Sequence, residues 1–207
     1  MPNILLRPKG YLSSGFSNHE SYRENPHTGI DFVYGFKKPC YALADGTIYK
    51  LMGDKSTNLM EYKNVYQICD TPVGLLEIAY VHCWDFLVDE QDFVLQGQPI
   101  YLEGNTGKSV FVGGKIVEVD EKWSGKGSHS HISVRPVEKT KESKGHFLND
   151  AKGKRYKDSD GFFYRIVWDN DVFKGWVDYS KWTYTPTDQQ LLMQLSKVLG
   201  YVKHQMK

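Results

Sequence analysis

Cysteine is scarce in this chain, and the cysteines present form no pairing pattern. The 207 residues include only Cys40, Cys69 and Cys83, and no two of them stand in a Cys-x-x-Cys spacing. An odd number of separated cysteines argues against a disulfide framework. We therefore expect reduced or buried thiols.

The chain also lacks an excess of charge and any long apolar run. Its 26 Lys and Arg residues nearly balance its 25 Asp and Glu residues, for a formal net charge of +1. This balance gives no overall electrostatic case for binding nucleic acid or a membrane surface. No apolar stretch approaches the roughly 18–20 residues that span a bilayer, so we expect no membrane insertion. The N-terminus lacks the basic start and apolar run of a signal peptide, which predicts a soluble chain made in the cytoplasm.

What the chain does have is a series of strand-like segments. Its 19 glycines and 14 tyrosines favour a β-rich fold with many turns. Strand-like runs occur at residues 41–52, 62–69, 75–83 and 94–102, and a short hairpin is predicted at 110–119. No helical pattern of 10–15 residues separates these runs, so the sheet should be mostly antiparallel.

Composition divides the chain into three parts. Residues 1–136 hold the strand series and form the predicted core. Residues 137–160 are basic and poor in apolar side chains, as expected of a solvated insertion or long loop. Residues 161–207 begin with an aromatic β segment and end in a predicted C-terminal helix with Thr187 as its N-cap. The apolar stripe of this helix packs on its own domain or, alternatively, forms a seam with a second copy or a virion partner.

Two imidazoles, His129 and His131, stand two residues apart in a strand-like run. Side chains at positions i and i+2 of a strand leave the same face, with Cβ atoms only about 7 Å apart. His27 and Asp31 are four residues apart, an even spacing that also places both side chains on one face of an extended chain. With His82 these residues are the candidates for one polar site.

Imidazole and carboxylate are ligands that zinc favours, and a catalytic zinc site uses three protein ligands with one position open for water. His27, Asp31 and one histidine of the pair at 129 and 131 would supply such a set. The other histidine and His82 would then serve in proton transfer or in stabilising a developing oxyanion.

Several segments, taken in order, resemble the motifs of the lysostaphin/LytM-like zinc endopeptidases, which cut the peptide cross-links or stems of bacterial peptidoglycan. Residues 27–31 (HTGID) resemble the HxxxD motif of that family, and residues 129–131 (HSH) resemble its HxH motif. Further matching segments are 39–48 (PCYALADGTI), 80–82 (YVH), 94–100 (VLQGQPI) and 104–109 (GNTGKS). The resemblance covers roughly residues 10–135 and is specific as a set.

This resemblance implies an open antiparallel β-sheet core with one zinc ion per chain. It implies that His27, Asp31 and His131 are the zinc ligands and that His129 and His82 are the catalytic histidines. The implied reaction is attack of a zinc-activated water on a scissile peptide bond of peptidoglycan. The two catalytic histidines would assist by proton transfer and by stabilising the tetrahedral intermediate.

The chain also departs from the family pattern. Residues 110–126 separate two motifs that the family joins almost directly, so specificity cannot be transferred. Cys83 directly follows His82, where its side chain should face away from the site. Residues after 136 have no match, and their aromatic side chains either bind the cell wall or have a structural role.

The resemblance leaves the identity of the cleaved bond open between glycine-containing cross-bridges and stems that contain D-alanine. The absence of a signal peptide favours a phage or prophage product, either a free endolysin or a virion-associated lysin. An alternative is a catalytically inactive or structural zinc-containing module of the same fold, acting in cell-wall binding or as a virion component.

Overall fold

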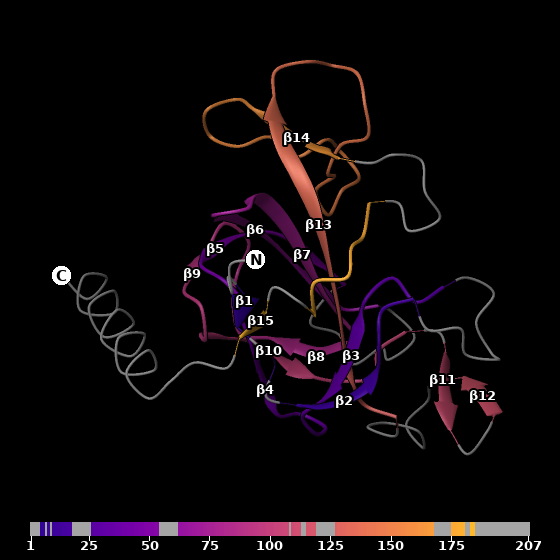
Figure 1. The fold of residues 1–207 in the computed structure, drawn as a ribbon. Helices are drawn as coiled ribbons and strands as arrows, with labels where there is room; N and C mark the ends of the chain where they lie inside the picture. Colours follow the sequence, from indigo (N-terminus) through magenta and orange to yellow (C-terminus); the bar gives the residue numbers. More distant parts are fainter. Residues whose placement is uncertain are drawn as a thin grey trace.

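One long strand, β13 (Ser130–Thr140), runs through the protein and connects its parts (Figure 1). The structure is a computed structural model and describes residues 5–6, 8, 10–17, 26–53, 62–107, 109–112, 115–118, 127–167, 175–180 and 183–184. The regular elements within these residues are strands, and all described pairings are antiparallel except that of β1 with β15. The expected mainly β, antiparallel fold is therefore confirmed. The expected C-terminal helix lies outside the described residues.

The largest sheet has eight strands. Seven follow the order β2-β3-β13-β7-β6-β5-β9, and β14 pairs with the far end of β13. Besides β13 its strands are β2 (Tyr11–Ser14), β3 (Ile30–Val33), β5 (Gly46–Met52), β6 (Asn64–Thr71), β7 (Gly74–Val81), β9 (Phe93–Val94) and β14 (Phe163–Ile166).

The remaining strands form three smaller units. A three-stranded sheet has the order β4-β10-β8, with β4 (Pro39–Tyr41), β10 (Pro99–Glu103) and β8 (Cys83–Phe86). The predicted hairpin is confirmed as β11 (Ser109–Val112) paired with β12 (Lys115–Glu118). The short strands β1 (Leu5–Leu6) and β15 (Thr183–Tyr184) pair in parallel. Among the described residues there is no helix with the length and hydropathy that crossing a membrane requires.

The two faces of β13 have different surroundings because successive side chains of a strand alternate between faces. Ile132 and Val134 point into the main core, which also contains side chains of the three-stranded sheet such as Ile100 and Tyr101. Burying an aliphatic side chain of this size contributes about 1.5–3 kcal/mol. This packing holds β13 in register, so the other face presents a fixed row of His131, Ser133 and Arg135.

A second cluster of buried side chains covers the far end of that row. Segment 141–166 contributes Leu148, Tyr156 and Tyr164, which pack with Tyr49 and Val137 of the large sheet. The basic segment is therefore largely exposed but anchored by a small core of its own. The boundary expected at 136 falls within β13, and the three-part division of the chain stays a prediction.

Candidate metal and catalytic site

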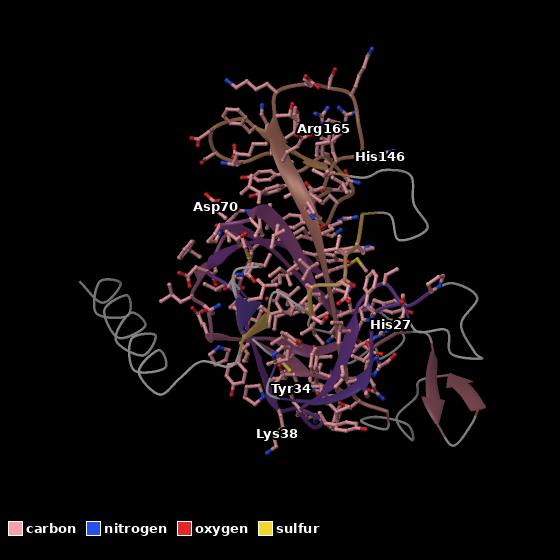
Figure 2. The ribbon with its side chains drawn as sticks, in the orientation of Figure 1. His27, Tyr34, Lys38, Asp70, His146 and Arg165 are labelled. Atoms are coloured by element: carbon pink, nitrogen blue, oxygen red, sulfur yellow. The ribbon has the colours of Figure 1, made fainter. Side chains whose placement is uncertain are left out.

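Three potential ligand atoms converge at the end of β13 next to β3. His131 Nδ1 lies 2.9 Å from Asp31 Oδ1 and 2.8 Å from His27 Nε2. His27 Nε2 lies 3.1 Å from Asp31 Oδ1, which closes a triangle of side chains that are buried or nearly so. His27 lies just before β3 in the sequence (Figure 2). Asp31 is part of β3, and His131 is part of β13.

Strand pairing brings these residues together. Asp31 and His131 are directly opposite each other in the antiparallel pair of β3 and β13, so their side chains leave the same face. His27 lies in the irregular segment just before β3, and Gly29 makes its close approach to β13 possible. A Cβ at Gly29 would lie 2.5 Å from the Ile132 carbonyl oxygen and 2.7 Å from His131 Nε2.

The outer nitrogen of each imidazole also has a partner. His27 Nδ1 lies 2.8 Å from the Gly15 carbonyl oxygen, which can only accept, so this nitrogen carries the proton and Nε2 has a free lone pair. His131 Nε2 lies 2.8 Å from the Ser133 hydroxyl. A His131 tautomer that donates to Ser133 likewise leaves a lone pair on Nδ1. Such outer partners fix the orientation and tautomer of metal-binding histidines.

The donor set fits a bound cation. Burial raises the pKa of Asp31, but the nearby imidazoles of His131, His27 and His129 together hold the pKa well below its ordinary value, so this carboxylate is anionic. An anionic oxygen and two nitrogen lone pairs therefore point at one another, an arrangement that a cation stabilises. Ligand atoms about 2.0–2.2 Å from a tetrahedral zinc lie roughly 3.3 Å apart, close to the spacing of the three atoms here.

His129 lies beside this triangle, at the last position before β13. The sequence placed it inside the strand, but the strand begins at Ser130. His129 Nδ1 donates to the Gly127 carbonyl oxygen at 2.8 Å, so Nε2 has the free lone pair and lies 3.9 Å from Asp31 Oδ2. The ring is partly exposed and can contact both a ligand of the triangle and solvent.

His82 completes the group at the junction of β7 and β8. The strand expected over residues 75–83 is interrupted here, because His82 adopts a left-handed backbone with φ of 67°. Its Nδ1 donates to the Thr106 carbonyl oxygen at 2.7 Å, and its ring centroid lies 4.7 Å from that of His129. Burial and the neighbouring His129 lower the pKa of His82 to about 3, so its imidazole is neutral near neutral pH.

A comparison with known families identifies the chain. The model described as Peptidase family M23 matches residues 25–142, which is more than half of the sequence. The chain belongs to peptidase family M23. This match confirms the resemblance to lysostaphin/LytM-like peptidases and includes all five histidine and aspartate residues of the site. No curated protein matches the chain.

Three solved structures are similar to this M23 chain at low identity. The catalytic domain of lysostaphin from Staphylococcus simulans is 19% identical with a TM-score of 0.42, over 61% of this chain and 80% of that one. The catalytic domain of a mutant of the prophage-encoded M23 protein EnpA from Enterococcus faecalis is 20% identical with a TM-score of 0.42, over 61% and 81%. A zinc-containing peptidase from Vibrio cholerae is 23% identical with a TM-score of 0.41, over 64% of this chain and 36% of that chain. This M23 chain thus spans about a third of the Vibrio protein.

A buried carboxylate that the motifs did not reveal connects two segments of the M23 site. Glu103 at the end of β10 accepts hydrogen bonds from the amides of Tyr34 and Gly35, at 2.5 and 3.0 Å. It also accepts one from the Ser128 hydroxyl at 2.5 Å, directly before His129. The sequence offered one signal for this role: Glu103 ends an otherwise apolar strand-like run and directly precedes Gly104.

The cysteines of the M23 chain stay out of the site. Cys83 is buried in the main core, where its thiol donates to the Tyr80 carbonyl oxygen, and burial raises its pKa well above the ordinary value. Cys40 and Cys69 are also buried and free. Among the described residues, the only group that could hold a metal is formed by His27, Asp31 and His131.

Proposed function

We propose that this M23 peptidase is a zinc-dependent endopeptidase that hydrolyses peptide bonds of bacterial peptidoglycan. The observation that carries the proposal is the convergence of His27 Nε2, Asp31 Oδ1 and His131 Nδ1 within 3.1 Å, with outer hydrogen bonds that direct two imidazole lone pairs inward. His27, Asp31 and His131 would hold one zinc ion. Three protein ligands leave one coordination position for water, as a catalytic zinc site requires.

A zinc ion bound there would polarise the scissile carbonyl and lower the pKa of a water molecule towards about 7. The protein supplies the proton transfer. His129 and His82 each donate from Nδ1 to a backbone carbonyl oxygen, which leaves Nε2 as the nitrogen that faces the reaction. His129 is the better placed to exchange protons with solvent, because part of its side chain is exposed. Buried His82 is neutral with its lone pair on Nε2, so it would first accept a proton from the attacking water. The protonated ring could then donate a hydrogen bond to the oxyanion of the tetrahedral intermediate.

The substrate assignment rests on the set of motifs shared with lysostaphin/LytM-like peptidases. The glycine cross-bridge and the D-alanine-containing stem both remain candidate substrates, because the same catalytic groups serve either bond. We further propose that the enzyme acts at the bacterial cell wall as a phage-type lysin, free or virion-associated. Residues 1–136 would form the catalytic core in this proposal, with 137–160 as an insertion and 161–207 packed upon it.

Zymography on purified cell walls tests this function. We expect clearing by the untreated protein, loss of clearing with a chelator, and recovery when zinc is added. Mass spectrometry of the released fragments identifies the bond. Absence of clearing while zinc is bound would contradict the hydrolase proposal and favour a non-catalytic zinc module.

A further inference from the structure

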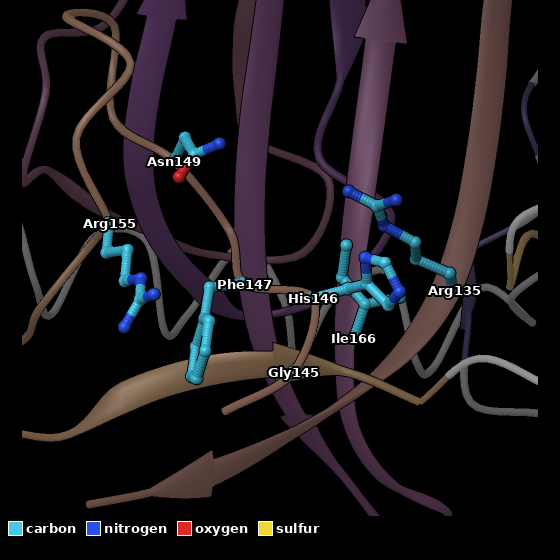
Figure 3. A pocket seen from close by; sticks show the side chains of 7 residues that line it. All are labelled: Arg135, Gly145, His146, Phe147, Asn149, Arg155 and Ile166. Carbon is cyan, nitrogen blue, oxygen red and sulfur yellow. The ribbon is translucent and has the colours of Figure 1, made fainter. Parts of the chain in front are cut away.

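A pocket of about 350 Å³ lies at the other end of the sheet face that carries the metal-binding triangle (Figure 3). Two arginines, Arg135 and Arg155, contribute to its wall. Figure 3 shows Arg135 beside His146 and Ile166 on one side, and Arg155 beside Phe147 on the other. Neither the family match nor the proposed catalytic group accounts for this pocket.

The pocket is aligned with the catalytic site along β13. His131, Ser133 and Arg135 alternate with the core residues Ile132 and Val134, so the three polar side chains share one face. The contact between His131 Nε2 and the Ser133 hydroxyl is direct evidence of that shared face. Four residues of a strand span roughly 13 Å, which is also the length of about four residues of an extended peptide.

Arg135 is held rigidly. Its Nε donates to Glu77 Oε2, and Glu77 is fully buried and also accepts from the Tyr49 hydroxyl. On its other side the guanidinium stacks on Trp176, with the Cζ atom 4.2 Å from the ring centroid. No described residue accepts a hydrogen bond from its Nη groups. A guanidinium fixed in this way is prepared to bind a planar anion without further ordering.

Arg155 gives the pocket its net positive charge. Its guanidinium lies over Phe147, 4.6 Å from the ring centroid, and its Nη1 donates to the Ser143 carbonyl oxygen at 3.0 Å. The charge of Arg135 is offset by Glu77, whereas Arg155 forms no ion pair with any described residue. A negatively charged group in the pocket would therefore gain a partner for this charge.

We propose that this pocket binds a carboxylate of the peptide substrate, about four residues away from the scissile bond. The proposal rests on the proposed function and adds a specificity site to it. Two features support this assignment, one for the carboxylate and one for the distance from the scissile bond. The two Nη groups of an arginine match the two oxygens of a carboxylate. Arg135 lies on the same strand face as His131, roughly 13 Å along β13. Ser133 between them is buried, so an extended peptide that joins the two sites would pass over Ser133 rather than contact it. A stem peptide that ends in D-alanine carries such a carboxylate.

The test compares two synthetic stem pentapeptides that differ only in a free or an amidated C-terminal carboxyl. Calorimetry measures their binding to the zinc-loaded His129→Ala variant of the 207-residue chain, in which turnover is blocked. We expect the acid to bind about tenfold more tightly than the amide, the usual effect of a charge-assisted hydrogen bond. Arg155→Gln should reduce this ratio towards one. Lys152→Gln is the control for loss of a positive charge, because Lys152 is exposed on the same segment and lies outside the pocket lining.

Arg135 needs a variant that preserves the fold, because its removal would leave buried Glu77 without its partner. Arg135→Lys keeps the positive charge beside Glu77 but removes the planar fork, and we expect it also to lower the acid-to-amide ratio. A thermal melt matching that of the parent protein verifies folding.

Equal binding of acid and amide by the folded parent protein would overturn the pocket assignment, even if cell walls are cleared. A ratio lost equally in Lys152→Gln would overturn it as well. Displacement of the acid peptide by inorganic phosphate at lower concentration than by acetate would replace the carboxylate with a phosphate ligand and so reject the proposal. Failure to clear cell walls while the ratio is retained would refute the proposed hydrolase alone.

Discussion

The Ser128 hydroxyl donates a 2.5 Å hydrogen bond to the carboxylate of Glu103, and this contact links the end of β10 to the segment that presents His129. The same carboxylate accepts hydrogen bonds from the backbone amides of Tyr34 and Gly35, which directly follow β3. One buried side chain thereby connects the strand of the Asp31 ligand with the loop of the catalytic histidine.

Removing this carboxylate should weaken the fold. Glu103→Ala removes the acceptor of one buried and two partly buried donors, and we expect a loss of about 2–5 kcal/mol in the free energy of unfolding. Glu103→Gln retains one acceptor oxygen and should cost roughly 1–2 kcal/mol. Urea unfolding measures both, with Glu142→Ala as a control at an exposed glutamate. An alanine variant as stable as the parent would show that the three contacts contribute nothing.

The two histidines of the HSH motif should separate into different roles. His131→Ala removes a proposed ligand, so we expect zinc to be lost. His129→Ala should retain one zinc per chain but lose about 10²–10⁴-fold in activity, the usual contribution of a general acid or base. Atomic emission spectroscopy and wall clearing measure the two effects. Full zinc occupancy in His131→Ala would remove it from the ligand set, and unchanged activity in His129→Ala would remove its catalytic role.

Ser133 should tune metal affinity without contacting the metal. Its hydroxyl lies 2.8 Å from His131 Nε2 and orients that ring. Loss of such an outer partner typically lowers metal affinity by about 10–100-fold, and we expect Ser133→Ala to fall near the lower end because the histidine remains. Competition with a chromogenic chelator gives the affinity. Exposed Ser143→Ala serves as the control, and an identical affinity for Ser133→Ala would exclude this role.

Asp158 should make the stability of segment 141–166 sensitive to acid. Burial raises its pKa, but hydrogen bonds from the Phe162 amide, Lys139 and the Tyr164 hydroxyl outweigh burial and hold the pKa below its ordinary value of 3.8. The carboxylate therefore stabilises the folded state above about pH 4, and this contribution is lost as pH falls through the folded pKa. Asp158→Asn should cost about 1 kcal/mol near neutral pH and much less in acid.

Chemical unfolding of both proteins at about pH 6 and about pH 3 measures this difference. The difference between the two proteins, rather than either curve alone, isolates Asp158 from other carboxylates. If the parent protein and Asp158→Asn differ in stability by the same amount at both pH values, the proposed role of the ionised Asp158 is wrong.

Local pattern was enough to predict much of the fold. Alternating apolar residues and turn-forming pairs predicted strands and the 110–119 hairpin, because strand periodicity depends on neighbours in the sequence. The even spacings within HTGID and HSH indicated which residues belong to one site, although His27 and His129 each lie just outside the neighbouring strand. The ligand and catalytic roles of the individual histidines came from the family resemblance, and those roles stay predictions.

Other features depended on contacts between distant parts of the chain. The pairing register that sets Asp31 opposite His131 joins residues 100 positions apart, and no local pattern specifies it. The His82 ring finds its hydrogen-bond partner at the Thr106 carbonyl oxygen, and the role of Glu103 arises from donors on two other segments.

The amino-acid sequence by itself determined the β character of the chain, the order of its motifs and the membership in the M23 family, since these follow from residue types and short spacings. Only the tertiary structure decided that the outer nitrogens of His27 and His131 are occupied and that Arg135 shares a face with the metal-binding triangle. The physical reason is that hydrogen-bond partners and strand register are set by packing between distant segments, which a linear pattern does not encode.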